Sequence, residues 1–266
     1  MPWPLRGVRD GVLTTRWPRR ADEYADAFRS AVTVRHHNPP GHGASRILAQ
    51  VVKDCPTDAI GNAGGRITVD RGRCILCGRC VDAAPEVFGW QHGTDAPALD
   101  RSALVVPRRA ESDEAIARVR DDLARRVRRL RRSVHIRHVD TGSDGSDEWE
   151  VQALLNPVYD VNRLGIFITA SPRHADILLA TGIGATGMVA PLARTRAAMP
   201  DPVIVVIAGA DAISGGLFRG GYASAGGAAA HLAVDVWVPG SPATPFDLMR
   251  GILLALGRVP ETAGAA

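Results

Sequence analysis

The run Cys74-Ile75-Leu76-Cys77-Gly78-Arg79-Cys80, together with Cys55-Pro56 upstream, decides how the first half of this chain is interpreted. Three cysteines stand at C-x2-C-x2-C spacing, and the fourth precedes a proline. These four are all the cysteines in the 266 residues. A triplet with a separate Cys-Pro is typical of 4Fe–4S ligation by four thiolates. We therefore predict that Cys55, Cys74, Cys77 and Cys80 bind one 4Fe–4S cluster, the cofactor and metal site of the chain.

The ligands of a second cluster are missing. In two-cluster ferredoxins the triplet continues as C-x3-C-P, and a matching triplet precedes the other Cys-Pro. Here Ala84 stands where the continued run needs cysteine. The other three positions are taken by Ser45, Leu48 and Val51. Structural zinc is the alternative for a C-x2-C pattern, although zinc usually takes two separated pairs rather than a triplet.

The composition indicates a folded protein of weak charge character. Apolar residues make up 45% of the chain and the net charge is +4, which does not indicate a nucleic-acid partner. No apolar run reaches the roughly 20 residues of a membrane span. The first residues lack the apolar segment of a secretory signal. Because free thiolates need a reducing compartment, we expect a cytoplasmic protein.

Composition and periodicity predict five segments. Residues 1–44 form an N-terminal arm with a short helix within 22–32, and residues 259–266 form a tail. Residues 45–108 form a ferredoxin-like α+β domain, with a helix at 47–52 and strands at 66–70 and 103–106. Residues 109–133 form a linker helix. Residues 134–258 form an α/β domain.

The linker helix has two distinct faces. Its apolar residues recur at steps of three and four: Ile116, Val119, Leu123, Val127 and Leu130. The opposite face is rich in arginine. One interpretation is a solvated helix whose charges match its dipole. The other is docking on an acidic partner or on lipid head groups.

Strands and helices alternate in residues 134–258. Strands are expected at 166–170, 177–180, 203–208 and 234–238, and helices at 148–156, 187–199 and 245–256. This alternation predicts a parallel, flavodoxin-like sheet covered by helices on both faces. Gly182 to Gly187 is a literal G-x-G-x-x-G between a strand and a helix. No acidic residue closes the next strand at the spacing of about 20 residues that a dinucleotide site needs, so a packing turn is favoured over nucleotide binding.

The first half resembles the ferredoxin-like subunit of complex I and of formate hydrogenlyase-type membrane-bound hydrogenases. The matching runs are GVLTTRWP at 11–18, CPTDAI at 55–60 and the cysteine triplet. The second half is similar to the 20-kDa subunit of complex I and to the small subunit of energy-converting nickel–iron hydrogenases. Its matching runs are LNPVYDVNRLG at 155–165, SPRHADILL at 171–179, DAISGGLF at 211–218 and VDVWVPG at 234–240.

The second resemblance implies a cluster site whose cysteines this chain has lost. The family's C-x-x-C pair falls on Ser143 and Ser146, its third cysteine on Asp211 and its fourth on Ser241. We refer to these four as the degenerate positions. Serine is not readily deprotonated and is a poor iron ligand. We expect an empty site in a retained fold; the alternative is another ion bound by Asp211 with Asp144 or Asp147.

The resemblance implies an iron–sulfur electron-transfer subunit of a complex I-like oxidoreductase, of the NADH–quinone oxidoreductase, formate hydrogenlyase or group 4 hydrogenase type. The α/β domain would then be a cluster-less docking module for a large subunit, with Arg173 and His174 packing or lying at the interface. No residue is assigned a catalytic role. The membrane is expected only through partners, on the cytoplasmic face of the inner membrane. The alternatives are a structural or assembly subunit with a non-redox cluster, and a nucleotide-binding reductase.

Overall fold

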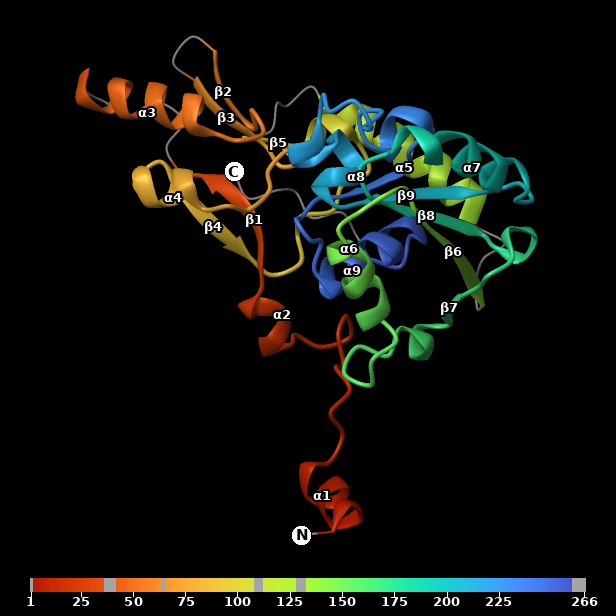
Figure 1. Cartoon of the computed structure of the whole chain (residues 1–266). Coiled ribbons are helices and arrows are strands. Elements are labelled where there is room, and N and C mark those ends of the chain that lie inside the picture. Colours follow the sequence, from red (N-terminus) through yellow and green to blue (C-terminus); the bar gives the residue numbers. More distant parts are fainter. Residues whose placement is uncertain (1, 36–41, 64–65, 108–111, 128–132, 260–266) are drawn as a thin grey trace.

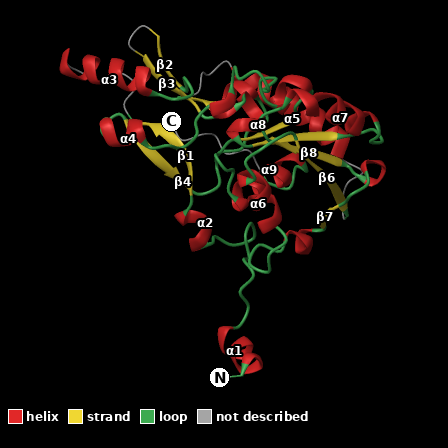
Figure 2. Cartoon of the chain, viewed as in Figure 1, coloured by secondary structure: helices red, strands yellow, loops and turns green. Residues whose placement is uncertain are grey.

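The chain folds into two halves that lie side by side (Figures 1 and 2). The computed structural model describes residues 2–35, 42–63, 66–107, 112–127 and 133–259. The orange and yellow half in Figure 1 contains two small antiparallel sheets, and the green to blue half contains one parallel sheet between helices. The predicted fold class, an α+β half followed by an α/β half, is confirmed.

The second half is built on five parallel strands. They are β6 (Val134–Asp140), β7 (Ile166–Ile168), β8 (Ile177–Thr181), β9 (Ile204–Ala208) and β10 (Val236–Val238), in the order β10-β9-β8-β6-β7. Every residue of β8 and β9 is buried. Such continuous apolar burial is expected for central parallel strands with both faces covered.

Helices cover both faces of this sheet. On one face lie α5 (Ser112–Val127), α6 (Ser146–Ala153) and α9 (Pro245–Ala255), and on the other α7 (Thr186–Ala197) and α8 (Ala210–Ser214). Side chains of β8 alternate between the two cores: Ile177 and Leu179 pack in the first, Leu178 and Ala180 in the second. The predicted helix-covered parallel sheet is therefore confirmed.

The basic helix predicted over 109–133 is α5, and it covers the sheet rather than only linking two domains. Leu123 and Val127 are buried in the first core, which confirms the apolar stripe. On the same helix, the Nη2 of Arg126 lies 2.7 Å from the Oδ2 of Asp235 and also bonds the carbonyl of Val203. Arg126, from the arginine-rich face, thus links α5 to the residues just before β9 and β10. Leu130 and its neighbours lie outside the described residues.

The first half has a separate core. Strand β1 (Arg29–Val34) pairs antiparallel with β4 (Phe88–His92), and β3 (Arg66–Asp70) lies between β2 (Ile60–Ala63) and β5 (Val105–Val106). Helices α3 (His42–Asp54) and α4 (Arg79–Ala83) accompany these sheets. The helix leading into Cys55 and the strand over 66–70 are confirmed. The closing strand is shorter than predicted, because residues 101–104 form the 3-10 helix η1 (Arg101–Leu104).

Residues before 36 contribute buried side chains to both halves of the molecule. The helix predicted within 22–32 is only α2 (Glu23–Ala27), and the chain continues as β1 from Arg29, with Val32 buried in the core of the first half. Trp17 packs edge-on against Phe246 of the second half, with ring centroids 6.0 Å apart. The segment predicted as an arm is therefore partly integrated. The domain boundaries given above remain predictions.

A short segment fastens the two halves together. Ala98 and Trp237 exchange backbone hydrogen bonds of 2.9 and 2.8 Å, which adds an antiparallel bridge to the edge of β10. Arg101 donates to both carboxylate oxygens of Asp70 at 2.8 and 2.7 Å, and its guanidinium lies 5.9 Å from the Trp237 ring centroid. We call Asp70, Arg101 and Trp237 the clasp. It ties the end of β3 to β10.

Replacing Arg101 with alanine is expected to loosen the contact between the halves. The variant loses a bidentate ion pair and a cation–π contact; because Arg101 is partly exposed, we expect a loss of about 1–2 kcal/mol in the free energy of unfolding. Urea denaturation measures it. The control is Arg125→Ala, whose exposed pair with Asp122 at 3.1 Å should contribute under about 0.5 kcal/mol. Equal losses in both variants would contradict the role of the clasp.

Candidate functional site

The structure brings the four cysteines around one cavity of about 480 Å³. Cys55 follows α3, Cys74 and Cys77 lie in the loop after β3, and Cys80 lies in α4. The other three cysteines each act electrostatically on the Cys74 thiol, so all four sulfurs are close neighbours. Cys55, about 20 residues away in sequence, is thus part of the same site.

The loop between Cys74 and Cys80 is tightly curled around this cavity. Leu76 and Gly78 adopt left-handed conformations, with φ of 54° and 80°. Glycine is needed at 78, since this conformation is strained for other residues and a Cβ there would lie 3.2 Å from the Trp90 ring. The curl directs backbone N–H groups inward.

Backbone amides donate to the cysteine sulfurs. The N–H of Ala59 bonds the Sγ of Cys55 at 3.2 Å. Backbone hydrogen bonds from Leu76 and Val81 lower the pKa values of Cys74 and Cys80. Amide donors directed at sulfur are a normal feature of iron–sulfur sites, where they stabilise negative charge on the cluster and its ligands.

Burial has the opposite effect on these thiols and dominates. It raises the pKa of Cys74 to about 12 and that of Cys80 to about 11. Without positive charge in the cavity, both would stay protonated near neutral pH. A bound metal replaces the thiol proton, because the thiolate is the ligand form. The cavity therefore suits a group that brings positive charge to four sulfurs.

Thr57 supplies a further indication of what the cavity holds. Its side chain lines the cavity and is only 7% exposed, yet its hydroxyl has no hydrogen-bond partner within the described part of the chain. Buried hydroxyls are nearly always bonded, so an orphan one needs a partner. A cluster sulfide or a ligand thiolate would accept this bond. Donor set, cavity, amides and orphan hydroxyl all fit a 4Fe–4S cluster.

Zinc and a cluster place different demands on the spacing of four sulfurs. Among the residues that the structure describes, no three His, Cys, Asp or Glu side chains are close enough to share one metal ion. A zinc ion requires its ligands at about 2.0–2.3 Å from a single point. In a cubane each thiolate binds a different iron, so the four sulfurs stand apart around it.

The degenerate positions lie in the segments that follow three strands of the parallel sheet: Ser143 and Ser241 in loops, Ser146 at the first residue of α6, and Asp211 in α8. Ser143 and Ser146 follow β6, Asp211 follows β9, and Ser241 follows β10. The carboxyl ends of parallel strands share an edge, so these segments lie at the same edge. Ala210 N–H bonds the Gly240 carbonyl at 2.6 Å, which joins the last two. The segments that carry Asp211 and Ser241 are therefore adjacent, and the assignment of all four positions to one former cluster site stays a prediction.

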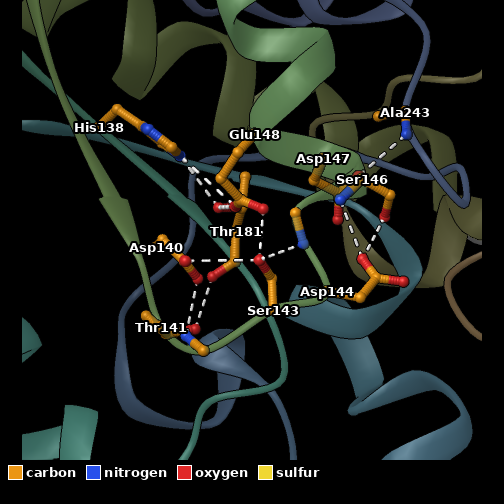
Figure 3. A network of polar contacts seen from close by, with 12 residues as sticks. His138, Asp140, Thr141, Ser143, Asp144, Ser146, Asp147, Glu148, Thr181 and Ala243 are labelled. Carbon is orange, nitrogen blue, oxygen red and sulfur yellow. Dashed lines mark hydrogen bonds and ion pairs between the residues drawn. The ribbon is translucent and has the colours of Figure 1, made fainter.

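The hydroxyls of Ser143 and Ser146, however, form hydrogen bonds with carboxylates nearby in the sequence (Figure 3). Ser143 donates to Glu148 and, at 3.4 Å, to Asp140. Ser146 donates to Asp144 at 2.6 Å. These bonds order the turn that starts α6, with acidic residues in the first turn as the helix dipole favours. None of these hydrogen bonds joins Ser143 or Ser146 to Asp211, the third degenerate position.

The side chain that bridges the loops is Asp147, which sequence reasoning named only as a possible ion ligand. It is 5% exposed and accepts the Ala243 N–H at 3.1 Å. A Cβ on Gly209 would lie 2.0 Å from its Oδ2, so Asp147 also fills the space against the end of β9. Burial, with added repulsion from Asp211 and other carboxylates, raises the pKa of Asp147 to about 7.

A second polar group holds the same edge of the sheet (Figure 3). The Nε2 of His138 on β6 lies 2.9 Å from the Thr181 hydroxyl on β8, which donates to Glu148 of α6. Burial lowers the pKa of His138, although Glu148 opposes this effect. The neutral imidazole near pH 7 thus links two strands and a helix.

Most amides of the glycine run at 182–187 are already hydrogen-bonded within the protein. The N–H groups of four consecutive residues already bond protein oxygens: Ile183 to Gly142, Gly184 and Ala185 to Thr141, and Thr186 to Ala223. A dinucleotide site would need such amides directed at pyrophosphate. The contacts favour the packing turn over nucleotide binding.

Arg173 and His174 are both exposed, in the short helix η3 (Pro172–His174). Their exposure does not support the expected packing role, and the expected interface role stays a prediction.

The four-cysteine cavity and the parallel α/β half suit an iron–sulfur protein, and comparison with known proteins supports this class. Residues 145–255 match the family described as NADH ubiquinone oxidoreductase, 20 Kd subunit. Residues 67–132 match the family described as 4Fe-4S single cluster domain. The second match contains the cysteine triplet but begins after Cys55, which the Cys-Pro pattern predicted as a ligand and which lines the same cavity.

Three relatives show how far the likeness extends. The chain is 39% identical over 161 residues to formate hydrogenlyase subunit 7 of Escherichia coli, covering 60% of this chain and 62% of that protein. It is 34% identical over 144 residues to the probable membrane-bound hydrogenase subunit mbhJ of Pyrococcus furiosus, covering 54% and 86%. It is 42% identical over 95 residues to a subunit of the NADH-quinone oxidoreductase of Rubrobacter xylanophilus, covering 35% and 38%.

The chain belongs to the family of the 20-kDa subunit of NADH–ubiquinone oxidoreductase. It spans less than two thirds of formate hydrogenlyase subunit 7.

The buried carboxyl of Asp147 should make stability depend on pH. Its folded pKa of about 7 exceeds the ordinary value of 3.8, so the folded state binds the proton more tightly. Stability therefore falls as the pH rises from about 4 to about 7. Asp147→Asn stays neutral, and we expect it to be more stable than the wild type by roughly 1–3 kcal/mol at pH 8 and nearly equal at pH 4.

Denaturation of both proteins across this pH range measures the difference. The control is Asp144→Asn, because Asp144 is exposed and hydrogen bonds from Ser146 lower its pKa. This control should not gain stability at pH 8. A gain in Asp147→Asn that is the same at every pH would contradict the assigned titration.

Proposed function

We propose that the chain is an electron-transfer subunit of a complex I-like or group 4 hydrogenase-type oxidoreductase, and that Cys55, Cys74, Cys77 and Cys80 hold one 4Fe–4S cluster. The observation that carries the proposal is the single cavity lined by all four cysteines, in a chain whose second half belongs to the 20-kDa family. When bound, the cluster would accept and release one electron. The surrounding residues hold it, donate hydrogen bonds to its sulfurs and exclude water.

The positions of the missing second cluster support a single cluster. Leu48, Val51 and Ala84 stand where cysteines would be needed, and all three are buried in the apolar core of the first half. Apolar packing has replaced those ligands. The family description of a single cluster domain points the same way.

The second half is proposed as a cluster-less module that docks on a large subunit. Exposed apolar side chains follow α8, with Leu217 60% and Phe218 51% exposed, and Tyr222 is fully exposed. Contiguous exposed apolar residues are typical of protein interfaces. Asp147 supports the cluster-less part, because its carboxyl joins the loops that a cluster would otherwise hold together.

The described residues include no helix that is both long and apolar enough to cross a bilayer. We propose that the chain is cytoplasmic and reaches the inner membrane as part of an assembly, as the names of its hydrogenase relatives suggest.

Cluster content tests the proposal. Anaerobically reconstituted protein should contain about four irons and four sulfides per chain, and reduction should give the EPR signal of one cluster. Cys77→Ser should lose most of the iron, whereas Ser241→Ala, the matched change at a degenerate position, should keep it. Eight irons, bound zinc, or a cluster that no reductant reduces would each refute the proposal; the last would indicate a structural subunit.

The hydroxyl of Thr57 is expected to raise the reduction potential of this cluster. Hydrogen bonds to cluster sulfurs stabilise the more negative, reduced state. Thr57→Val keeps the shape and removes the donor, so its midpoint potential should be lower than that of the wild type. Thr57→Ser keeps the donor and should stay near the wild type. An EPR-monitored redox titration measures all three, and an unchanged potential in Thr57→Val would show that the hydroxyl bonds elsewhere.

A further inference from the structure

The first residues of the chain stand away from the body of the molecule (Figure 1). Helix α1 (Trp3–Asp10) has no buried residue. Trp3 is 85% and Val8 83% exposed, and Val12 just beyond the helix is 80% exposed. At helical spacing Leu5 and Val8 fall on one side with Pro4, Arg6 and Arg9 fall on the other side, and Trp3 begins the helix apart from Leu5 and Val8. Nothing in the described structure covers this apolar side.

Residues 11–20 connect α1 to the rest of the chain, and we call them the tether. They are rich in arginine. A cavity of about 460 Å³ is lined by Arg16, Arg19, Arg20 and Arg163, together with Val12 and two threonines. Its lining, all within the described residues, contains no carboxylate. The nearest acidic groups acting on Arg163 are Asp160 and Asp22, and Asp22 is also bonded by Thr15.

The tether itself is fixed to the second half. Thr15 N–H bonds the Val158 carbonyl at 2.8 Å, and Thr14 donates to the Pro157 carbonyl at 2.7 Å. Arg163 donates to the carbonyl of Trp17, whose ring is buried. The arginine-lined cavity is therefore held in place, while α1 extends beyond it.

We propose that residues 2–20 and Arg163 form a docking surface for an anionic lipid bilayer. The exposed tryptophan and aliphatic side chains enter the interface between head groups and acyl chains, and the arginines bind lipid phosphates. Residues 2–20 contain five arginines and a single acidic residue, Asp10. Apolar residues beside a net positive charge complement an anionic membrane, whereas an acidic protein surface would leave Trp3 and Val8 without apolar cover.

This surface is remote from the cysteine cavity in sequence and shares none of its lining residues. It gives the chain a direct contact with the membrane, in addition to any contact made through partner subunits. The proposal does not depend on the cluster.

Sedimentation of the full chain with vesicles tests the surface. Wild type should bind vesicles of phosphatidylcholine with phosphatidylglycerol, and binding should fall severalfold between about 50 and 500 mM NaCl because salt screens the arginines. Trp3→Ala with Val8→Ala should weaken binding severalfold, and so should Arg19→Ala with Arg20→Ala. The control Arg173→Ala with Arg194→Ala removes two exposed charges elsewhere and should bind like the wild type. Far-UV circular dichroism checks that each variant is folded.

Three results would overturn the proposal. The wild type could fail to bind anionic vesicles, or the variants of residues 3–20 could bind no worse than the control. Inorganic phosphate could also release the chain from vesicles at an ionic strength at which NaCl does not, which would make the cavity a site for a free anion.

Discussion

Four cysteine sulfurs around one cavity cannot all be thiolates unless positive charge lies among them. Burial keeps the proton on Cys74 and Cys80, and each neighbouring sulfur adds repulsion. The curled loop with left-handed Leu76 and Gly78, the inward amides and the orphan hydroxyl of Thr57 are all arranged around this requirement. The first half has few buried side chains of its own, so a bound metal group would couple directly to its folding. The second half, with two continuous cores on its sheet, has no such dependence.

The cysteine site and most helices and strands of the second half could be predicted from the sequence. Cysteine spacing identified the four residues that line the cavity, because thiolate ligands of a cluster come from a small set of spacings. Apolar periodicity located α5, α6, α7 and α9 and four of the five parallel strands, since helix-covered strands are continuous apolar runs. Strand β6, an inner strand of the sheet, was not predicted because the partly exposed polar residues His135, Arg137 and His138 interrupt its buried positions.

Other features depend on contacts that are distant in sequence. Nothing in the sequence of residues 29–34 indicates that they pair with residues 88–92 and complete the core of the first half. Near the start of α6, the sequence alone does not distinguish Asp144 from Asp147. Only the fold exposes the first and buries the second against Gly209 and Ala243, where its pKa rises. Likewise, the glycine run matched a nucleotide pattern by sequence, and only the hydrogen bonds of its amides show that they are already satisfied by the protein.

The clasp between Asp70, Arg101 and Trp237 joins two modules that belong to one polypeptide. An ion pair and a ring contact alone would hold separate proteins together only weakly, because association costs translational and rotational freedom. Covalent linkage replaces that bimolecular step with a high effective concentration, so a modest contact is sufficient. Fusion also fixes the stoichiometry: every copy of the α/β module is synthesised with one cysteine-bearing module already beside it, and neither can be diluted away from the other.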